Sequence, residues 1–242
     1  MDILQSEVAA LVSEEHKPFE GVRLLVFDLD GTLIDSKLDL ALAVNAAREH
    51  LGLPPLQHEE IFGYVGHGAS LLIRRSLGAT PSEEQVERAL QFFLEYYVKH
   101  MLDNTLTYPG VREALAELAA RGFGPGKERP MAVLTNKPVR FSERIIEGLG
   151  LSGYFRHVYG GNSFEKKKPD PVGVETLLRD CKAQPREAMV IGDSEIDIQT
   201  ARNAGTWACG VTYGMGSHML AEYPPDLLLD SLAELPAHLN AR

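Results

Sequence analysis

Cysteine is scarce in this 242-residue sequence, which contains only Cys181 and Cys209. The two residues lie far apart, and no pattern of metal-binding partners surrounds either of them. We therefore interpret both as buried, reduced thiols of a cytoplasmic protein.

Other features are missing as well. No run of about 18 apolar residues is present that could span a membrane. The first residues carry Asp2, Glu7 and Glu14 where a signal peptide would have a cationic start and an apolar core. The formal net charge of −10 argues against the basic face that nucleic acids require. We expect a cytoplasmic protein with neither a membrane nor a nucleic-acid partner, and both a monomer and a homodimer stay open.

The composition is ordinary for a globular protein, with 44% hydrophobic and 24% charged residues. The negative net charge does not exclude a small anionic substrate, because a metal ion and one lysine can reverse the field inside a cleft. A small phosphorylated metabolite is therefore compatible with this sequence.

One segment dominates the sequence. An apolar stretch over 22–27 reads as a buried strand and ends abruptly in Asp28-Leu29-Asp30-Gly31-Thr32. Residues two apart on a strand face the same side, so Asp28 and Asp30 would share one space at its carboxyl end. Two such close carboxylates repel each other unless a proton or a cation lies between them. Oxygen ligands of this kind favour magnesium.

Helical patterns fill roughly seventy residues after Thr32, and strands and helices then alternate. Strands are expected over 22–27, 131–134, 157–159, 188–191, 206–211 and 226–229, and helices near 40–51, 90–101 and 110–121 and after Pro138, Pro171 and Ser194. The alternation predicts an α/β fold, a Rossmann-like parallel sheet with helices on both faces, and a small helical bundle inserted after the first strand. We divide the chain into a helical arm (1–20), an α/β core (21–35 and 106–242) and the helical insertion (36–105).

The insertion contains two notable patterns. Its strongest helical stripe consists of Leu90, Phe93, Leu94, Tyr97, Val98 and Met101. This stripe could line a ligand site, but we interpret it as core packing of the bundle. Three glycines within 63–68 indicate a mobile or tightly turned loop that could act as a lid.

Polar clusters follow four of the predicted strands at their carboxyl ends, where open α/β sheets bind ligands. They are Asp28 with Asp30, Thr135 with Asn136, Lys168, and Asp193 with Asp197. A hydroxyl and free amides directly before a helix can bind an anion, which describes the second cluster. The proline after Lys168 restricts that residue. Asp193 and Asp197 lie about one helical turn apart, so both carboxylates can reach one cation.

These clusters resemble, in the same order, the four motifs of the haloacid dehalogenase superfamily of phosphotransferases. They stand here as FDLDGT, LTN, KKKPDP and IGDSEID, and the resemblance covers residues 22–240. The helical insertion resembles the small helical cap of that family. The sequence is closest to the phosphoglycolate phosphatase subgroup, on the loop GYVGHGA with Leu71-Leu72, Tyr108-Pro109-Gly110, Gly160-Gly161 and Asn203-Ala204-Gly205.

The resemblance implies a role for each acidic residue. Asp28 would be the nucleophile that forms an aspartyl-phosphate, and Asp30 the general acid that later acts as the base. A magnesium ion would bind the Asp28 carboxylate, the Asp30 backbone carbonyl and Asp193. Asp197 would orient these ligands rather than bind directly.

The resemblance also implies the phosphate-binding residues. Lys168, Thr135 and the amide of Asn136 would hold the phosphate oxygens, where charge spreads in the transition state. In the cap, the substrate-binding candidates are Gly66, His67 and Gly68, with Arg74 as a candidate partner for a substrate carboxylate.

The implied activity is magnesium-dependent hydrolysis of a phosphomonoester, with 2-phosphoglycolate as the first substrate candidate. Pyrophosphate, a nucleoside monophosphate or a sugar phosphate remain alternatives. Asp30 favours phosphate-ester chemistry, because dehalogenases of the superfamily lack this second aspartate. A sugar-phosphate mutase and a phosphoacceptor binding module also remain open, but the cap residues that such mutases carry are missing, and receiver domains are about half this length.

Overall fold

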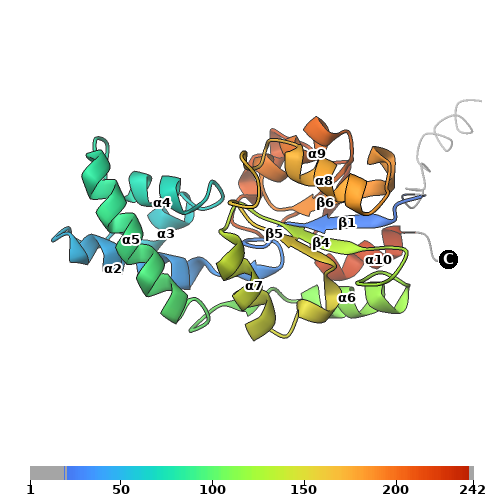
Figure 1. Ribbon diagram of the computed structural model, residues 1–242, viewed down its shortest axis with the longest axis horizontal. Coiled ribbons are helices and arrows are strands. Elements are labelled where there is room, and N and C mark those ends of the chain that lie inside the picture. The colour runs from blue at the N-terminus through green and yellow to red at the C-terminus, as the bar shows by residue number, and fades with distance from the viewer. Residues whose placement is uncertain (1–18, 20, 240–242) are drawn as a thin grey trace, which may run out of the picture.

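The computed structural model describes residue 19 and residues 21–239. The predicted helical arm over 1–20 lies outside the described residues apart from Phe19, which forms an isolated bridge with Leu239. Figure 1 shows an α/β unit built around one sheet and, beside it, a separate group of helices. Within the described residues, every helix is too short or too polar to cross a membrane.

Six strands form a single sheet in which every pairing is parallel. Their order is β5 (His157–Tyr159), β4 (Met131–Leu134), β1 (Leu24–Phe27), β6 (Ala188–Gly192), β7 (Trp207–Val211) and β8 (Leu227–Leu229). All six predicted strands are present and end within two residues of their predicted bounds. The α/β fold class is therefore confirmed.

Helices cover both faces of this sheet (Figure 1). One face carries α8 (Val172–Asp180) and α9 (Glu195–Ala204), and the other carries α6 (Val111–Ala120), α7 (Val139–Gly148) and α10 (Leu235–His238). Side chains alternate along β1. Leu24 and Val26 pack on the face that carries α8 and α9, and Leu25 and Phe27 pack on the face that carries α6 and α7. Four short 3₁₀ helices complete the unit: Ser152–Tyr154, Pro185–Glu187, Ser217–Ala221 and Leu232–Glu234.

The chain order creates a switch point beside β1. The crossover from β1 reaches β4 on one side, and β6 pairs with β1 on the other side. Crevices at the carboxyl ends of parallel strands form at such points, because the connections leave in opposite directions. The residues that follow β1, β4 and β6 therefore meet in one place.

The group of helices in Figure 1 comprises α2 (Lys37–His50), α3 (His58–Phe62), α4 (Ala69–Ser76) and α5 (Glu83–His100). We call this group the cap. The chain enters and leaves it through an antiparallel ribbon of β2 (Ile34–Asp35) and β3 (Leu106–Thr107), which sequence patterns had not indicated. The proposed limits of the insertion, 36 and 105, fall next to these strands. The glycine-rich loop lies between α3 and α4.

The longest cap helix follows its sequence signals. Ser82 caps α5, and its side chain exchanges hydrogen bonds with Gln85 in a capping box. Phe93 and Tyr97 of the predicted stripe are buried and belong to the same hydrophobic core as Leu25 and Phe27 of β1. They also line a cavity beside Asp28, so the stripe both packs the bundle and forms a wall of the cavity.

A buried carboxylate ties the two connections of the cap together. Asp39, on α2, is 1% exposed and accepts hydrogen bonds from the backbone N–H groups of Asn104 and Thr105, at 3.0 and 2.8 Å. The amide side chain of Asn104 and the hydroxyl of Thr105 donate to it as well, at 2.8 and 2.7 Å. The segment that leaves the cap is thus fixed to the helix that begins it.

We predict that Asp39→Ala lowers the free energy of unfolding by about 3 kcal/mol, because buried donors then lose their acceptor. Urea denaturation measures this change. Asp103→Ala is the matched control, since Asp103 is exposed and contacts only His100 among the ion pairs. It should change the free energy of unfolding by less than about 0.5 kcal/mol. Equal effects of the two variants would contradict the anchoring role of Asp39.

Candidate active site

Asp28 lies at the switch point, directly after β1. Its carboxylate is buried, and Oδ1 is 2.8 Å from Nζ of Lys168. Burial raises the pKa of Asp28 to about 6; Lys168 counteracts this effect, and Asp197 adds to it. Burial and the ammonium of Lys168 therefore act on the pKa of this carboxylate in opposite directions.

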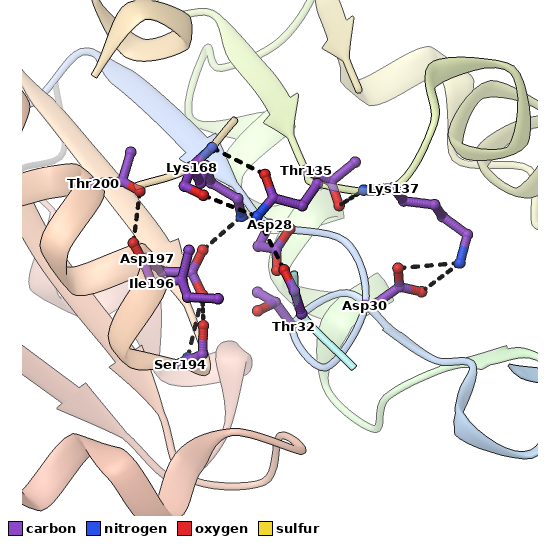
Figure 2. Close-up of polar contacts among 12 residues, drawn as sticks. Asp28, Asp30, Thr32, Thr135, Lys137, Lys168, Ser194, Ile196, Asp197 and Thr200 are labelled. Atoms are coloured by element: carbon purple, nitrogen blue, oxygen red, sulfur yellow. Dashed lines mark hydrogen bonds and ion pairs between the residues drawn. The ribbon is translucent and has the colours of Figure 1, made fainter. Parts of the chain in front are cut away.

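Lys168 connects two of the acidic clusters. Figure 2 shows its ammonium group between Asp28 and Asp197, and the distance to Asp197 Oδ1 is 2.6 Å. Burial alone would lower the pKa of Lys168, but the carboxylates of Asp197 and Asp28 outweigh it and raise the pKa. Asp197 is fixed in turn, because its Oδ2 accepts hydrogen bonds from the backbone and hydroxyl of Ser194 at the start of α9.

Asn136 holds the backbone of Lys168 in place. Its Oδ1 accepts a hydrogen bond from the N–H of Lys168 at 3.0 Å, and its Nδ2 donates to the Lys168 carbonyl at 3.1 Å. The same Nδ2 donates to the carbonyl of Gly66 in the cap loop at 3.0 Å. The side chain of Asn136 therefore links the end of β4 to the backbone of Lys168 and to the cap.

Thr135 presents a hydroxyl next to these groups. It is 3% exposed, follows β4 and accepts a hydrogen bond from the N–H of Lys137 at 3.3 Å. Among the described residues its own hydroxyl proton has no acceptor within hydrogen-bond distance. Together with the ammonium of Lys168, this donor makes the space beside Asp28 suitable for an anion.

Three buried carboxylates form a cluster that suits a divalent cation. One oxygen each of Asp28, Asp193 and Asp197 lies within 4.8 Å of the others. Burial, together with the nearby carboxylates of Asp197 and Asp28, raises the pKa of Asp193 to about 8. Hard carboxylate oxygens in this number match the ligand preference of magnesium. A cation would replace the proton that such a raised pKa implies.

Asp193 is held tightly from several sides. Its oxygens accept hydrogen bonds from the hydroxyl of Thr32 at 3.3 Å and from the N–H of Gly216 at 2.8 Å. Gly31 has φ +88°, and a Cβ on it would lie 2.4 Å from Oδ2 of Asp193. A side chain at position 31 is therefore excluded both by the backbone conformation and by this carboxylate.

Asp30 belongs to a second group. Its carboxylate accepts hydrogen bonds from Ser36 Oγ at 2.5 Å and from Lys137 Nζ at 2.9 and 3.1 Å. Figure 2 shows this pair on the opposite side of Asp28 from Lys168. The Asp30 carboxylate is thus outside the three-carboxylate cluster, and metal binding by its backbone carbonyl stays a prediction.

A small cavity, the inner cavity, lies where cap and core meet. The core contributes five polar residues to its lining: Asp28, Asp30, Thr135, Asn136 and Lys137. The cap contributes glycines and apolar or aromatic residues, among them Gly66, Gly68, Leu72, Phe93 and Tyr97. The predicted residues Gly66 and Gly68 are therefore brought next to the predicted catalytic aspartates.

A second space, the outer cavity, opens on the other side of the same aspartates. His67, Arg75, Asp193, Glu195 and His218 are among its lining residues. His67 thus lines the outer cavity but not the inner one, whereas Gly68 lines the inner cavity and Gly66 lines both. Burial and the nearby Arg75 lower the pKa of this histidine.

The structure does not place Arg74 at the site. Its guanidinium forms two hydrogen bonds with Glu83, at 2.9 and 2.6 Å, in an exposed ion pair at the start of α5. Among the described residues it lines neither cavity, whereas the next residue, Arg75, lines the outer one. The prediction of Arg74 as a carboxylate partner is corrected accordingly.

Sequence analysis missed Lys137, Tyr97 and Ser36. Lys137 is 6% exposed and pairs with Asp30, 107 positions earlier in the chain. It also precedes a proline and follows the end of a strand, the same signal that singled out Lys168. Tyr97 belongs to the stripe that could line a ligand site but is interpreted as core packing, and Ser36 has no distinguishing pattern.

Comparison with known proteins agrees with this geometry. The family model described as haloacid dehalogenase-like hydrolase matches residues 25–211. A phosphoglycolate phosphatase of Vibrio parahaemolyticus is 38% identical over 223 residues, which cover 89% of this chain and 95% of the relative. One of Chromobacterium violaceum is 39% identical over 221 residues, covering 88% and 95%.

A solved structure supports the same relationship. The crystal structure of a predicted phosphoglycolate phosphatase from Haemophilus somnus superposes with a TM-score of 0.82 at 30% identity and covers 89% of this chain and 96% of its own. The resemblance expected from the four motifs is thus confirmed, together with the expected class of phosphoric monoester hydrolases.

We predict that magnesium stabilises the protein through the carboxylate cluster. At about 100 times its dissociation constant the ion adds about 2.7 kcal/mol, which raises the melting temperature by about 5 to 10 °C in a chain of this size. The increase should be larger above pH 8 than at pH 6, because Asp193, with a pKa of about 8, must lose its proton. Thermal melts with and without the ion measure it.

Asp193→Asn should abolish this stabilisation, whereas Asp230→Asn, on an exposed aspartate, should preserve it. Without metal, the native state keeps a proton on Asp193 between its ordinary pKa of 3.8 and about 8, and the unfolded state loses it. Stability should therefore fall as the pH rises through this window, and Asp193→Asn should flatten that slope. A shift with magnesium in Asp193→Asn would contradict the assignment.

Proposed function

The chain belongs to the haloacid dehalogenase-like hydrolases, and we propose that it is a magnesium-dependent phosphomonoesterase that works through an aspartyl-phosphate on Asp28. The observation that carries the proposal is the buried Asp28 carboxylate, which lies 2.8 Å from the ammonium of Lys168 and lines the same cavity as Thr135. A nucleophile next to an anion site is what phosphoryl transfer requires. A small phosphorylated metabolite in the cytoplasm is the substrate class that we propose.

In the first step, an oxygen of Asp28 attacks phosphorus and the bond from phosphorus to the ester oxygen breaks. The departing oxygen takes the proton of Asp30, which must therefore enter the step as the acid. Lys168, Thr135 and the N–H of Asn136 would hold the other phosphate oxygens, where charge accumulates in the transition state.

In the second step, Asp30 is a carboxylate and removes a proton from a water molecule. The water oxygen attacks phosphorus, the bond to Asp28 breaks, and inorganic phosphate leaves. Asp28, the backbone carbonyl of Asp30 and Asp193 would hold magnesium, and Asp197 would orient them. The ion would neutralise charge on the phosphate and on its carboxylate ligands.

We propose 2-phosphoglycolate as the substrate. The two curated relatives described above bear the name phosphoglycolate phosphatase. The inner cavity also supports a small leaving group, because its volume is about 40 Å³. One water needs roughly 10 to 15 Å³ of such space, so the cavity holds about three or four groups of that size.

A larger phosphate ester or pyrophosphate is the second candidate. The outer cavity has a volume of about 290 Å³, and the side chains of His67, Arg75 and His218 line it. A nucleoside or sugar could enter this space while its phosphate lies at Asp28. Substrate preference therefore tells which of the two cavities receives the leaving group.

We predict that Asp28→Asn lowers kcat by at least about 10⁴-fold, because the amide is a poor nucleophile. Phosphate release measures turnover, and a thermal melt checks that the variant is folded. Mass spectrometry of acid-quenched protein should find a phosphoryl group in the wild-type protein and none in the variant. Full activity in the variant would rule out Asp28 as the nucleophile.

Asp30→Asn separates the acid from the nucleophile. The variant should lose activity on alkyl phosphates, whose leaving oxygen needs a proton. With p-nitrophenyl phosphate, whose leaving group needs no proton, it should still form the aspartyl-phosphate but hydrolyse it slowly. An unchanged rate with an alkyl phosphate would contradict the role of Asp30.

We predict that kcat/KM for 2-phosphoglycolate exceeds that for sugar phosphates, nucleoside monophosphates and pyrophosphate by at least about 100-fold, since the inner cavity is small. A panel assayed by phosphate release with magnesium measures these values. A maximum on another compound would leave the catalytic assignments intact and replace 2-phosphoglycolate as the substrate.

A further inference from the structure

Lys137 is a buried cation that has no role in the two proposed steps of the phosphatase reaction. Its side chain is 5% exposed, and its ammonium lies 2.9 Å from Asp30 and 4.7 Å from the centre of the Tyr97 ring. It lies in the inner cavity, on the far side of Asp30 from Lys168. Among the described lining residues of that cavity, it is the one with a cationic side chain.

Tyr97 adds a second polar group at the same place. The residue is 1% exposed, and among the described residues its hydroxyl interacts with the ammonium of Lys137 without a well-formed hydrogen bond. A buried hydroxyl whose hydrogen bonding is incomplete costs free energy. Such a group in a cavity beside the catalytic aspartates is available to a ligand.

The other walls of the inner cavity are largely apolar. Leu72 and Phe93 of the cap and Phe141 of α7 line it together with Lys137. Anions are attracted to an ammonium more strongly in such surroundings than in water, because the local dielectric constant is low. The inner cavity is therefore built to bind a small group that is apolar on one side and anionic on the other.

We propose that Lys137 and the hydroxyl of Tyr97 form an anion subsite that binds the carboxylate of a short phosphorylated carboxylic acid. This inference rests on the proposed phosphatase function and names the group that its leaving part carries. A methylene and a carboxylate fit the three or four water-sized groups that the inner cavity holds.

The experiment compares kcat/KM for 2-phosphoglycolate and for ethyl phosphate, which lacks the carboxylate. We expect the wild-type protein to prefer 2-phosphoglycolate by at least about 100-fold, the discrimination that a lost charged partner gives. Lys137→Met should reduce this preference by at least about 30-fold, and Tyr97→Phe by about 3- to 10-fold. Absolute rates are expected to fall in both variants, so the ratio between the substrates is the measured quantity.

Tyr97→Phe carries a second measurement. Because the hydroxyl of Tyr97 has no well-formed hydrogen bond in the free protein, its removal should change the melting temperature little while it lowers the preference. A residue with a merely structural role would show the opposite, lower stability with an unchanged preference. Lys99→Met, on the exposed side of the same helix α5, is the matched control and should leave both quantities unchanged.

Arg75→Met tests the outer cavity as the rival carboxylate site. The proposal is overturned if Arg75→Met abolishes the preference for 2-phosphoglycolate while Lys137→Met retains it. It is also overturned if Lys137→Met lowers kcat/KM for both substrates by the same factor. In either case the wild-type protein still hydrolyses 2-phosphoglycolate, so the proposed function stands. If the wild-type protein hydrolyses no phosphate ester of the panel although magnesium binds, the proposed function falls and the subsite falls with it.

Discussion

Four carboxylates and two ammonium groups meet at the carboxyl edge of the sheet, and their balance governs the site. Asp28, Asp193 and Asp197 cluster around Lys168, while Asp30 pairs with Lys137. Two negative charges remain without a cationic partner in this set. Burial is the main cause of the raised pKa values of Asp28 and Asp193; the neighbouring carboxylates add to it, and Lys168 counteracts it. A divalent cation corrects the same imbalance and leaves the carboxylates ionised.

Backbone packing keeps these charges in place. A Cβ on Gly192 would lie 2.1 Å from the Cγ of Asp197, and one on Gly214 would lie 2.1 Å from the Cβ of Asp193. Main chain therefore approaches the carboxylates where any other residue would need space. The side-chain amide of Asn136 also fixes the backbone of Lys168 through two hydrogen bonds. Charges held by the fold need no rearrangement during a reaction, which is how such sites stabilise developing charge.

Sequence patterns predicted the parts of this site that depend on local order. The strands have apolar runs of their own, and Asp28, Thr135 and Asp193 follow strand ends, so the parallel sheet alone brings them together. Contacts between distant segments left no such pattern. Asp30 pairs with Lys137 within the core, across 107 positions of the chain, and the position of Tyr97 depends on how the cap meets the core, which the order of elements does not fix.

The two adjacent arginines of α4 illustrate the same limit at the scale of one residue. A helix turns by about 100° per residue, so Arg74 and Arg75 point in different directions and only the docked position of α4 decides which one faces the aspartates. The loop before α4 is anchored to the core through Gly66 and Asn136. That contact fixes the position of the cap residues that line the inner cavity, and the cavity is enclosed only while they lie there. Selection by size and enclosure of the reacting groups are therefore two results of the same cap position.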